Sequence, residues 1–271
     1  MRTFLFILTI ILCMVSCQDV IEVQVPTSEP RLVIDASIKW LKGTSGSQQS
    51  IKLSLTAPYF DTEVPAANQA TVTITDADGS VFNFIEEEDT GVYKNNNFIP
   101  VLGGVYTLTI IYNQETYTAT ETLMAVTPID SVTQKNNSGF SGEAYALKAF
   151  YSDPPNQENF YFFEFSNNNL PVVSLEVYND EFTDGNQIFA FYSDSDTALG
   201  DEITISNHGI SKQFYDFMFI LLQQTADQSG GPFEVQPATV RGNCINQTNP
   251  DNFPLGYFRL SETDQVVHII K

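Results

Sequence analysis

Apolar and polar side chains alternate with a period of two along most of the chain after residue 30. Ile51, Leu53 and Leu55 fall on one face of an extended segment, with polar residues between them. The turn sequence at residues 76–79 (DADG) separates two such runs and indicates a hairpin. About seven short strands over residues 31–126 match the density of an immunoglobulin-like β-sandwich.

The pattern changes after residues 127–130 (TPID) and the polar stretch 134–142, which together indicate a domain junction. Strands predicted beyond this point are richer in aromatic residues. Residues 159–165 (NFYFFEF) are aromatic on both faces, which predicts a central strand buried on both sides. Residues 127–271 are therefore expected to form a second β-rich domain.

One segment, near residues 211–226, has helical periodicity. Its large apolar residues recur at spacings of three and four and so lie on one helical face: Phe214, Phe217, Met218, Leu221 and Leu222. Ser211 is the expected N-cap, and Gly230-Gly231-Pro232 ends the helical pattern. A helix this apolar is expected in a core rather than on a partner. The predicted fold is thus all-β, with an N-terminal immunoglobulin-like sandwich followed by a second β-rich domain containing one amphipathic helix.

The N-terminus has the order of a secretory signal. Arg2 precedes an apolar run at residues 4–15, which ends at Ser16-Cys17. The Cys after a small residue resembles the bacterial lipobox, which predicts a signal peptide at 1–16 and a lipid-modified Cys17. A transmembrane anchor is disfavoured because a span needs about 20 apolar residues and this run is shorter. Residues 17–30 then form either a tether or, through their valines, an added edge strand.

Charge and cysteine content narrow the possible partners. The chain carries 33 Asp and Glu against 12 Lys and Arg, for a net charge of −21. Such a surface repels phosphate backbones and anionic lipid, so nucleic-acid binding is excluded and the acyl chains must provide the membrane attachment. Of three cysteines, Cys13 leaves with the signal and Cys17 carries lipid. Cys244 remains alone, so no internal disulfide is expected.

No motif for catalysis or metal binding stands out. His208 and His268 are the only histidines, and neither belongs to a recognisable ligand pair or catalytic motif. The acidic turns 76–79 and 193–196 (SDSD) lack the full calcium-loop pattern. We therefore expect no catalytic residues, no metal and no cofactor. A hydrolase with a hidden pair of carboxylates is the least favoured alternative.

Tyrosines offer the one hint of ligand contact, because a ring presents an apolar face and a polar tip. Core packing is the favoured interpretation for each candidate, and a glycan- or peptide-binding surface is the alternative: Tyr145, Tyr151, Tyr178, Tyr192 and Tyr257. The tripeptides at 130–132 (DSV) and 196–198 (DTA) resemble O-glycosylation sites of some envelope bacteria.

Read in order, several segments resemble an uncharacterised lipoprotein family, domain of unknown function 4249. They are Cys17 and residues 30–35 (PRLVID), 91–93 (GVY), 104–108 (GVYTL), 128–131 (PIDS), 153–155 with 159–161, 200–201, 237–238, 241–243 and 256–258. The resemblance implies an outer-membrane lipoprotein of Gram-negative bacteria, often encoded near TonB-dependent receptors. The family has no established site residues to carry over. At Cys244 the family comparison indicates a buried small side chain rather than a reactive thiol.

The expected function is a non-enzymatic, lipid-anchored outer-membrane protein that assists a TonB-dependent receptor, or binds its ligand, in nutrient uptake. A stand-alone surface module that binds glycan or peptide is the alternative. The sequence leaves open whether the protein faces the periplasm or the cell surface.

Overall fold

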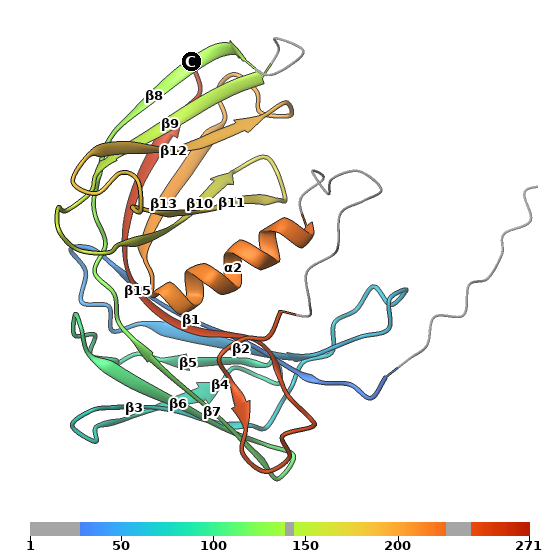
Figure 1. Cartoon of the computed structure of the whole chain (residues 1–271). Coiled ribbons are helices and arrows are strands. Elements are labelled where there is room, and N and C mark those ends of the chain that lie inside the picture. Colours follow the sequence, from blue (N-terminus) through green and yellow to red (C-terminus); the bar gives the residue numbers. More distant parts are fainter. Residues whose placement is uncertain (1–27, 139–143, 226–239) are drawn as a thin grey trace, which may run out of the picture.

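The computed structural model describes residues 28–138, 144–225 and 240–271. The predicted signal peptide, the Cys17 lipid site and all but the last three residues of the tether lie outside the described residues, as does the expected helix stop at 230–232. Within the described part of the chain, no helix is long and apolar enough to cross a membrane. The regular structure of that part is mostly β-strand, with one helix, which confirms the predicted fold class (Figure 1).

The first half of the chain forms the predicted β-sandwich. Its strands are β1 (Leu32–Leu41), β2 (Gln49–Leu55), β3 (Thr71–Asp76), β4 (Val81–Glu86), β5 (Val92–Asn95), β6 (Val105–Tyr112) and β7 (Glu115–Thr122). Strands β1, β2 and β5 face β3, β6 and β7 across a closed core, and β4 pairs with both β3 and β5. The alternating residues Ile51 and Leu53 point into this core and are fully buried. The 76–79 segment makes the expected hairpin turn between β3 and β4.

The second half adds a separate three-stranded sheet, further strands of the large sheet, and the helix. The elements are β8 (Ile129–Ser138), β9 (Ala144–Ser152), β10 (Phe160–Asn167), β11 (Val173–Asn179), β12 (Gln187–Asp194), β13 (Glu202–Gly209), α2 (Lys212–Thr225), β14 (Ile245–Asn246) and β15 (Leu255–Ile269). Strands β12, β9 and β8 form a separate sheet that covers one face of β10 and β13. Helix α2 packs on the opposite face, against β10 and β11.

Strand β10 is the central, doubly buried strand that its aromatic pattern predicts. Tyr161, Phe163 and Phe165 point into the core beneath β9 and β12, whereas Phe160 and Phe162 point toward α2. The helix begins where expected, because the backbone amide of Phe214 donates a 3.2 Å hydrogen bond to the Ser211 side chain.

Strand β15 joins the two halves into one sheet of twelve strands. Its first part runs parallel to β1, from the Leu255–Val33 pair to the Thr263–Leu41 pair, and its second part runs antiparallel to β13. The sequence places all of 127–271 in the second domain. In the structure, the single continuous strand Leu255–Ile269 belongs to both halves. The first half of β15, with β14 on β7, completes the first sandwich because β1 otherwise has an unpaired edge.

Candidate functional site

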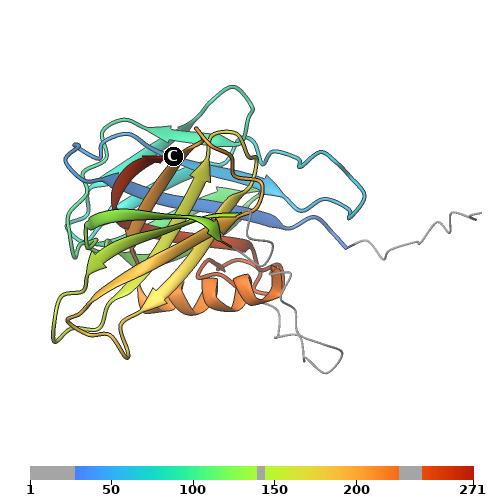
Figure 2. The same cartoon turned by 90° about the horizontal axis from the view of Figure 1, so that it is seen from above.

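A pocket of about 980 Å³ lies between helix α2 and the sheet. Its residues come from α2 on one side and from β1, β2, β5, β10, β11 and β15 on the other. Helix α2 lies on the inner side of the bend in β15, and the turned view shows the helix running beneath the sheet (Figures 1 and 2). Small-molecule sites have volumes of about 300–1,000 Å³, so this pocket is large enough for an organic ligand.

One wall of the pocket is apolar and aromatic. It is formed by Phe214, Phe217, Met218 and Leu221 of α2, with Leu175 of β11 and Tyr257 of β15. The Tyr257 ring lies 4.9 Å from the rings of both Phe214 and Phe217, centroid to centroid. The helical face that the sequence assigns to a core therefore has two roles, because it packs on the sheet and also lines the pocket.

Among the five candidate tyrosines, Tyr257 alone lines this pocket. Tyr151 and Tyr192 are buried in the core of the second half, and Tyr145 and Tyr178 pack against that core. The structure thus supports the core interpretation for those four rings.

The other wall is polar and carries most of the pocket's charge. Period-two alternation sends the core residues of β1 and β2 inward, so Asp35, Lys39 and Lys52 point to the pocket side of the same sheet. The four pocket cations are Lys39, Lys52, Lys94 and Arg259, which is a third of the 12 Lys and Arg in the chain. Two carboxylates, Asp35 and Glu164, line the same pocket. The residues that line the pocket therefore carry two more positive than negative charges, whereas the whole chain has a net charge of −21.

Glu164 of β10 is the centre of an ion-pair cluster at the back of this wall. Its carboxylate lies 2.7 Å from Lys39 Nζ and 3.1 Å from an Arg259 guanidinium nitrogen. Arg259 is only 4% exposed, and Glu164 is its ion-pair partner among the described residues. Burial opposes ionisation of Glu164, but the neighbouring His208, Lys39 and Arg259 side chains outweigh it and hold the pKa of Glu164 well below its usual range. Glu164 is therefore ionised and cannot act as a general acid near neutral pH.

His208 of β13 adjoins this cluster as a neutral side chain. Its Nδ1 lies 2.8 Å from the Thr263 hydroxyl and its Nε2 lies 3.5 Å from Glu164. Burial lowers the pKa of His208 to about 4. The second histidine, His268 on β15, lies apart and contacts Gln134 at 2.9 Å.

The buried neutral state of His208 predicts acid sensitivity. The unfolded chain binds a proton at His208 below its ordinary pKa of 6.5, whereas the folded protein does so only near pH 4. Stability is therefore full above pH 6.5 and falls by on the order of 2–3 kcal/mol as the pH drops toward 4. Urea unfolding at pH 7 and pH 5 should show a smaller pH difference for His208→Gln than for the unsubstituted protein. His268→Gln is the control, because His268 is only partly buried. Equal pH differences in both variants would contradict the assignment.

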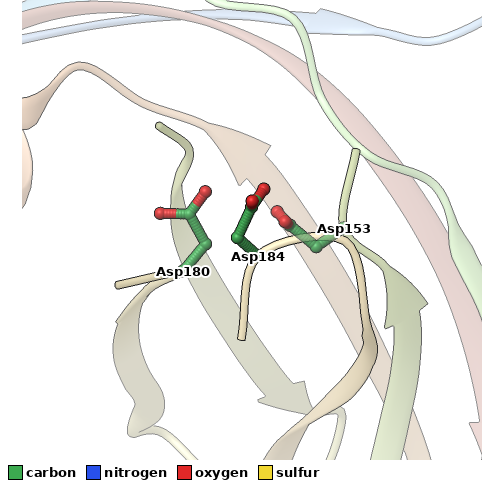
Figure 3. A group of neighbouring side chains, drawn as sticks. All are labelled: Asp153, Asp180 and Asp184. Atoms are coloured by element: carbon green, nitrogen blue, oxygen red, sulfur yellow. The ribbon is translucent and has the colours of Figure 1, made fainter. Parts of the chain in front are cut away.

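Three aspartates form a separate cluster that the sequence did not reveal (Figure 3). Asp153 follows β9, and Asp180 and Asp184 lie in the turn after β11, with side-chain oxygens within 4.8 Å of one another. Carboxylate oxygens are the ligands that calcium prefers. Each aspartate already accepts a hydrogen bond from the facing loop, through the Gly185, Asn159 and Asn156 amides respectively. Through these bonds the three aspartates hold the loop at 153–159 against the loop at 180–186, and we call this cluster a clamp.

Sequence patterns could not identify this clamp, because its two loops are separated by two strands in the chain and come together only through the fold.

The acidic turn at 76–79 is a local hydrogen-bonded turn, in which the Asp76 side chain accepts hydrogen bonds from the backbone amides of Asp78 and Ser80.

The remaining candidates from the sequence are Cys244 and the two tripeptides that resemble O-glycosylation sites. Cys244 is 8% exposed in the first core, and burial raises the pKa of its thiol to about 12, as expected for an unreactive small side chain. Of the two glycosylation-like sites, Ser131 is exposed, whereas Thr197 is buried with its hydroxyl 2.7 Å from that of Tyr192.

The fold and pocket together define a double β-sandwich protein with a helix-covered pocket. A family model described as "Domain of unknown function (DUF4249)" matches residues 18–266, and the chain belongs to this family. A search of curated proteins finds no match.

Solved structures give weak likenesses. A two-domain fibronectin type III segment of chicken tenascin is 10% identical, with a TM-score of 0.22, covering 66% of this chain and 90% of that one. A DUF4785 family protein of Legionella pneumophila is 8% identical, with a TM-score of 0.25, covering 66% of this chain and 52% of that one.

Proposed function

We propose that this protein is a non-enzymatic lipoprotein of the outer membrane that binds a small ligand and assists a TonB-dependent receptor in nutrient uptake. The pocket between α2 and the sheet is the observation that carries the binding role. It has the size of a ligand site, one apolar wall and a few charged groups converging on the other wall. The N-terminal signal with Cys17 supports the lipid anchor.

The pocket chemistry favours binding over catalysis. A hydrolytic pair needs one carboxyl group that can donate a proton near neutral pH. The neighbouring His208, Lys39 and Arg259 side chains lower the pKa of Glu164 and so favour its ionised form. The three clustered aspartates lie outside the pocket and are engaged by loop amides.

The experiment for this proposal is recovery of the receptor. The tagged protein, extracted from the outer membrane in mild detergent, is expected to retain a TonB-dependent receptor. Cys17→Ala should release the protein into the soluble fraction, and Ser16→Ala, which leaves the thiol in place, is the matched control. Consistent recovery without any receptor would contradict the partnership, and membrane retention of Cys17→Ala would contradict the acyl anchor.

A further inference from the structure

The pocket separates its apolar and cationic groups onto opposite walls. Helix α2 supplies the apolar wall through Phe217, Met218 and their neighbours, and the sheet supplies the lysines. A purely apolar ligand would leave Lys52 without an ion-pair partner, and a small inorganic anion would leave the aromatic wall exposed to water. A ligand with both an apolar body and an anionic group satisfies both walls.

We propose that this pocket binds an amphipathic organic anion, with its apolar body against α2 and its carboxylate or related acid group at Lys52 and Lys94. This inference rests on the proposed ligand-binding function and specifies the chemical class of its ligand.

Lys52 and Lys94 are the cations left for a ligand. Lys39 and Arg259 are both paired with Glu164 inside the cluster. Lys52 is exposed and makes no ion pair within 4.0 Å to any described residue. Lys94 pairs with Glu87 at 2.6 Å, but both side chains are about half exposed, and such a surface pair is weak and easily exchanged for another anion.

Strand register places these two lysines close together. Lys94 of β5 pairs with Ser50 of β2, and Lys52 follows two residues later on the same face. Such diagonal neighbours lie roughly 7–8 Å apart. Because both side chains lie on the same face of the sheet, one acid group between them can be attracted by both ammonium groups. The arrangement is notable because the chain as a whole is strongly acidic.

Two fluorescent dyes that differ by one acid group test the proposal. 8-Anilinonaphthalene-1-sulfonate and N-phenyl-1-naphthylamine share an aromatic body, and only the first carries a sulfonate. Both are titrated against residues 17–271 carrying Cys17→Ala, which removes the need for detergent. We expect the sulfonate dye to bind about tenfold more tightly, and a rise in NaCl from 0.05 to 0.5 M to weaken only its binding.

Three variants on the same background assign the effect to the two walls. Lys52→Gln should weaken sulfonate binding about fivefold and leave the neutral dye within twofold. Lys135→Gln removes the same charge from an exposed position on β8, outside the pocket, and should change neither dye. Phe217→Ala should weaken both dyes. Circular dichroism and thermal melting confirm that each variant is folded.

Several results would overturn the proposal. Equal affinity for the two dyes would show that the pocket has no anion preference, and equal effects of Lys52→Gln and Lys135→Gln would place the effect outside the pocket. Binding of neither dye would show that the pocket does not admit an amphipathic anion. All these readouts are independent of receptor recovery, so the dye experiment can fail while the proposed receptor partnership stands, and the reverse.

Discussion

Gly256→Ala is expected to destabilise the protein by more than about 4 kcal/mol, a large fraction of the roughly 5–15 kcal/mol by which a typical native protein is stable. Gly256 has φ +89°, a conformation that a residue with a side chain rarely adopts. A Cβ at this position would lie 2.0 Å from the backbone oxygen of Ile34, which cannot move without breaking the β1–β15 pairing. Because that pairing joins the two halves of the protein, the clash affects both.

Gly79→Ala is the matched control for this effect. Gly79 has nearly the same φ, +86°, but a Cβ there would have no neighbour within 4 Å. It should therefore cost only the backbone strain of about 1–2 kcal/mol. Urea denaturation gives the free energy of unfolding of both variants. The difference between their losses separates the cost of steric overlap from the cost of backbone strain. Similar losses for the two would show that the close approach of β1 and β15 is not what requires glycine.

Glu164→Gln is expected to cost about 3–5 kcal/mol, because it leaves the buried Arg259 guanidinium without its counter-charge. The cost should depend on pH in a defined direction. The lowered pKa of Glu164 means that its stabilisation is fully present above the ordinary value of 4.5 and is lost as the pH falls below that value. The difference between the variant and the unsubstituted protein should therefore be largest at neutral pH and shrink in acid.

The matched control is Glu87→Gln, which removes the same charge from an exposed pair with Lys94. That pair is solvent-screened, so the expected cost is below about 1 kcal/mol. Chemical denaturation at pH 7 and pH 4 gives the free energy of unfolding of each variant. These values compare Glu164→Gln with Glu87→Gln and neutral with acidic pH. A loss at Glu164 no greater than at Glu87 would show that the cluster adds little to stability.

Local sequence patterns predicted the individual elements well. Alternation at Ile51 and Leu53 identified β2 and its buried face, and the aromatic run at 159–165 identified the doubly buried strand β10. Spacings of three and four identified α2, and Ser211 marked its start. These features depend on residues only a few positions apart, so the physical reasons for them are present in the local sequence.

The net charge and the position of Cys244 as the one cysteine outside the N-terminal segment follow from the sequence alone. The predicted lipid site at Cys17 likewise follows from the N-terminal motif. The tertiary structure alone decided which strands that are distant in the chain are neighbours. The parallel pairing of β1 with β15 joins residues more than 200 positions apart, and no local pattern encodes it. Loop-closure entropy rises only slowly with loop length, so burial and hydrogen bonding of the free β1 edge can select a distant partner. The same pairing brings Arg259 beside Lys39 and Glu164, and places the lysines of β2 and β5 opposite helix α2, so the pocket exists only once the chain has folded.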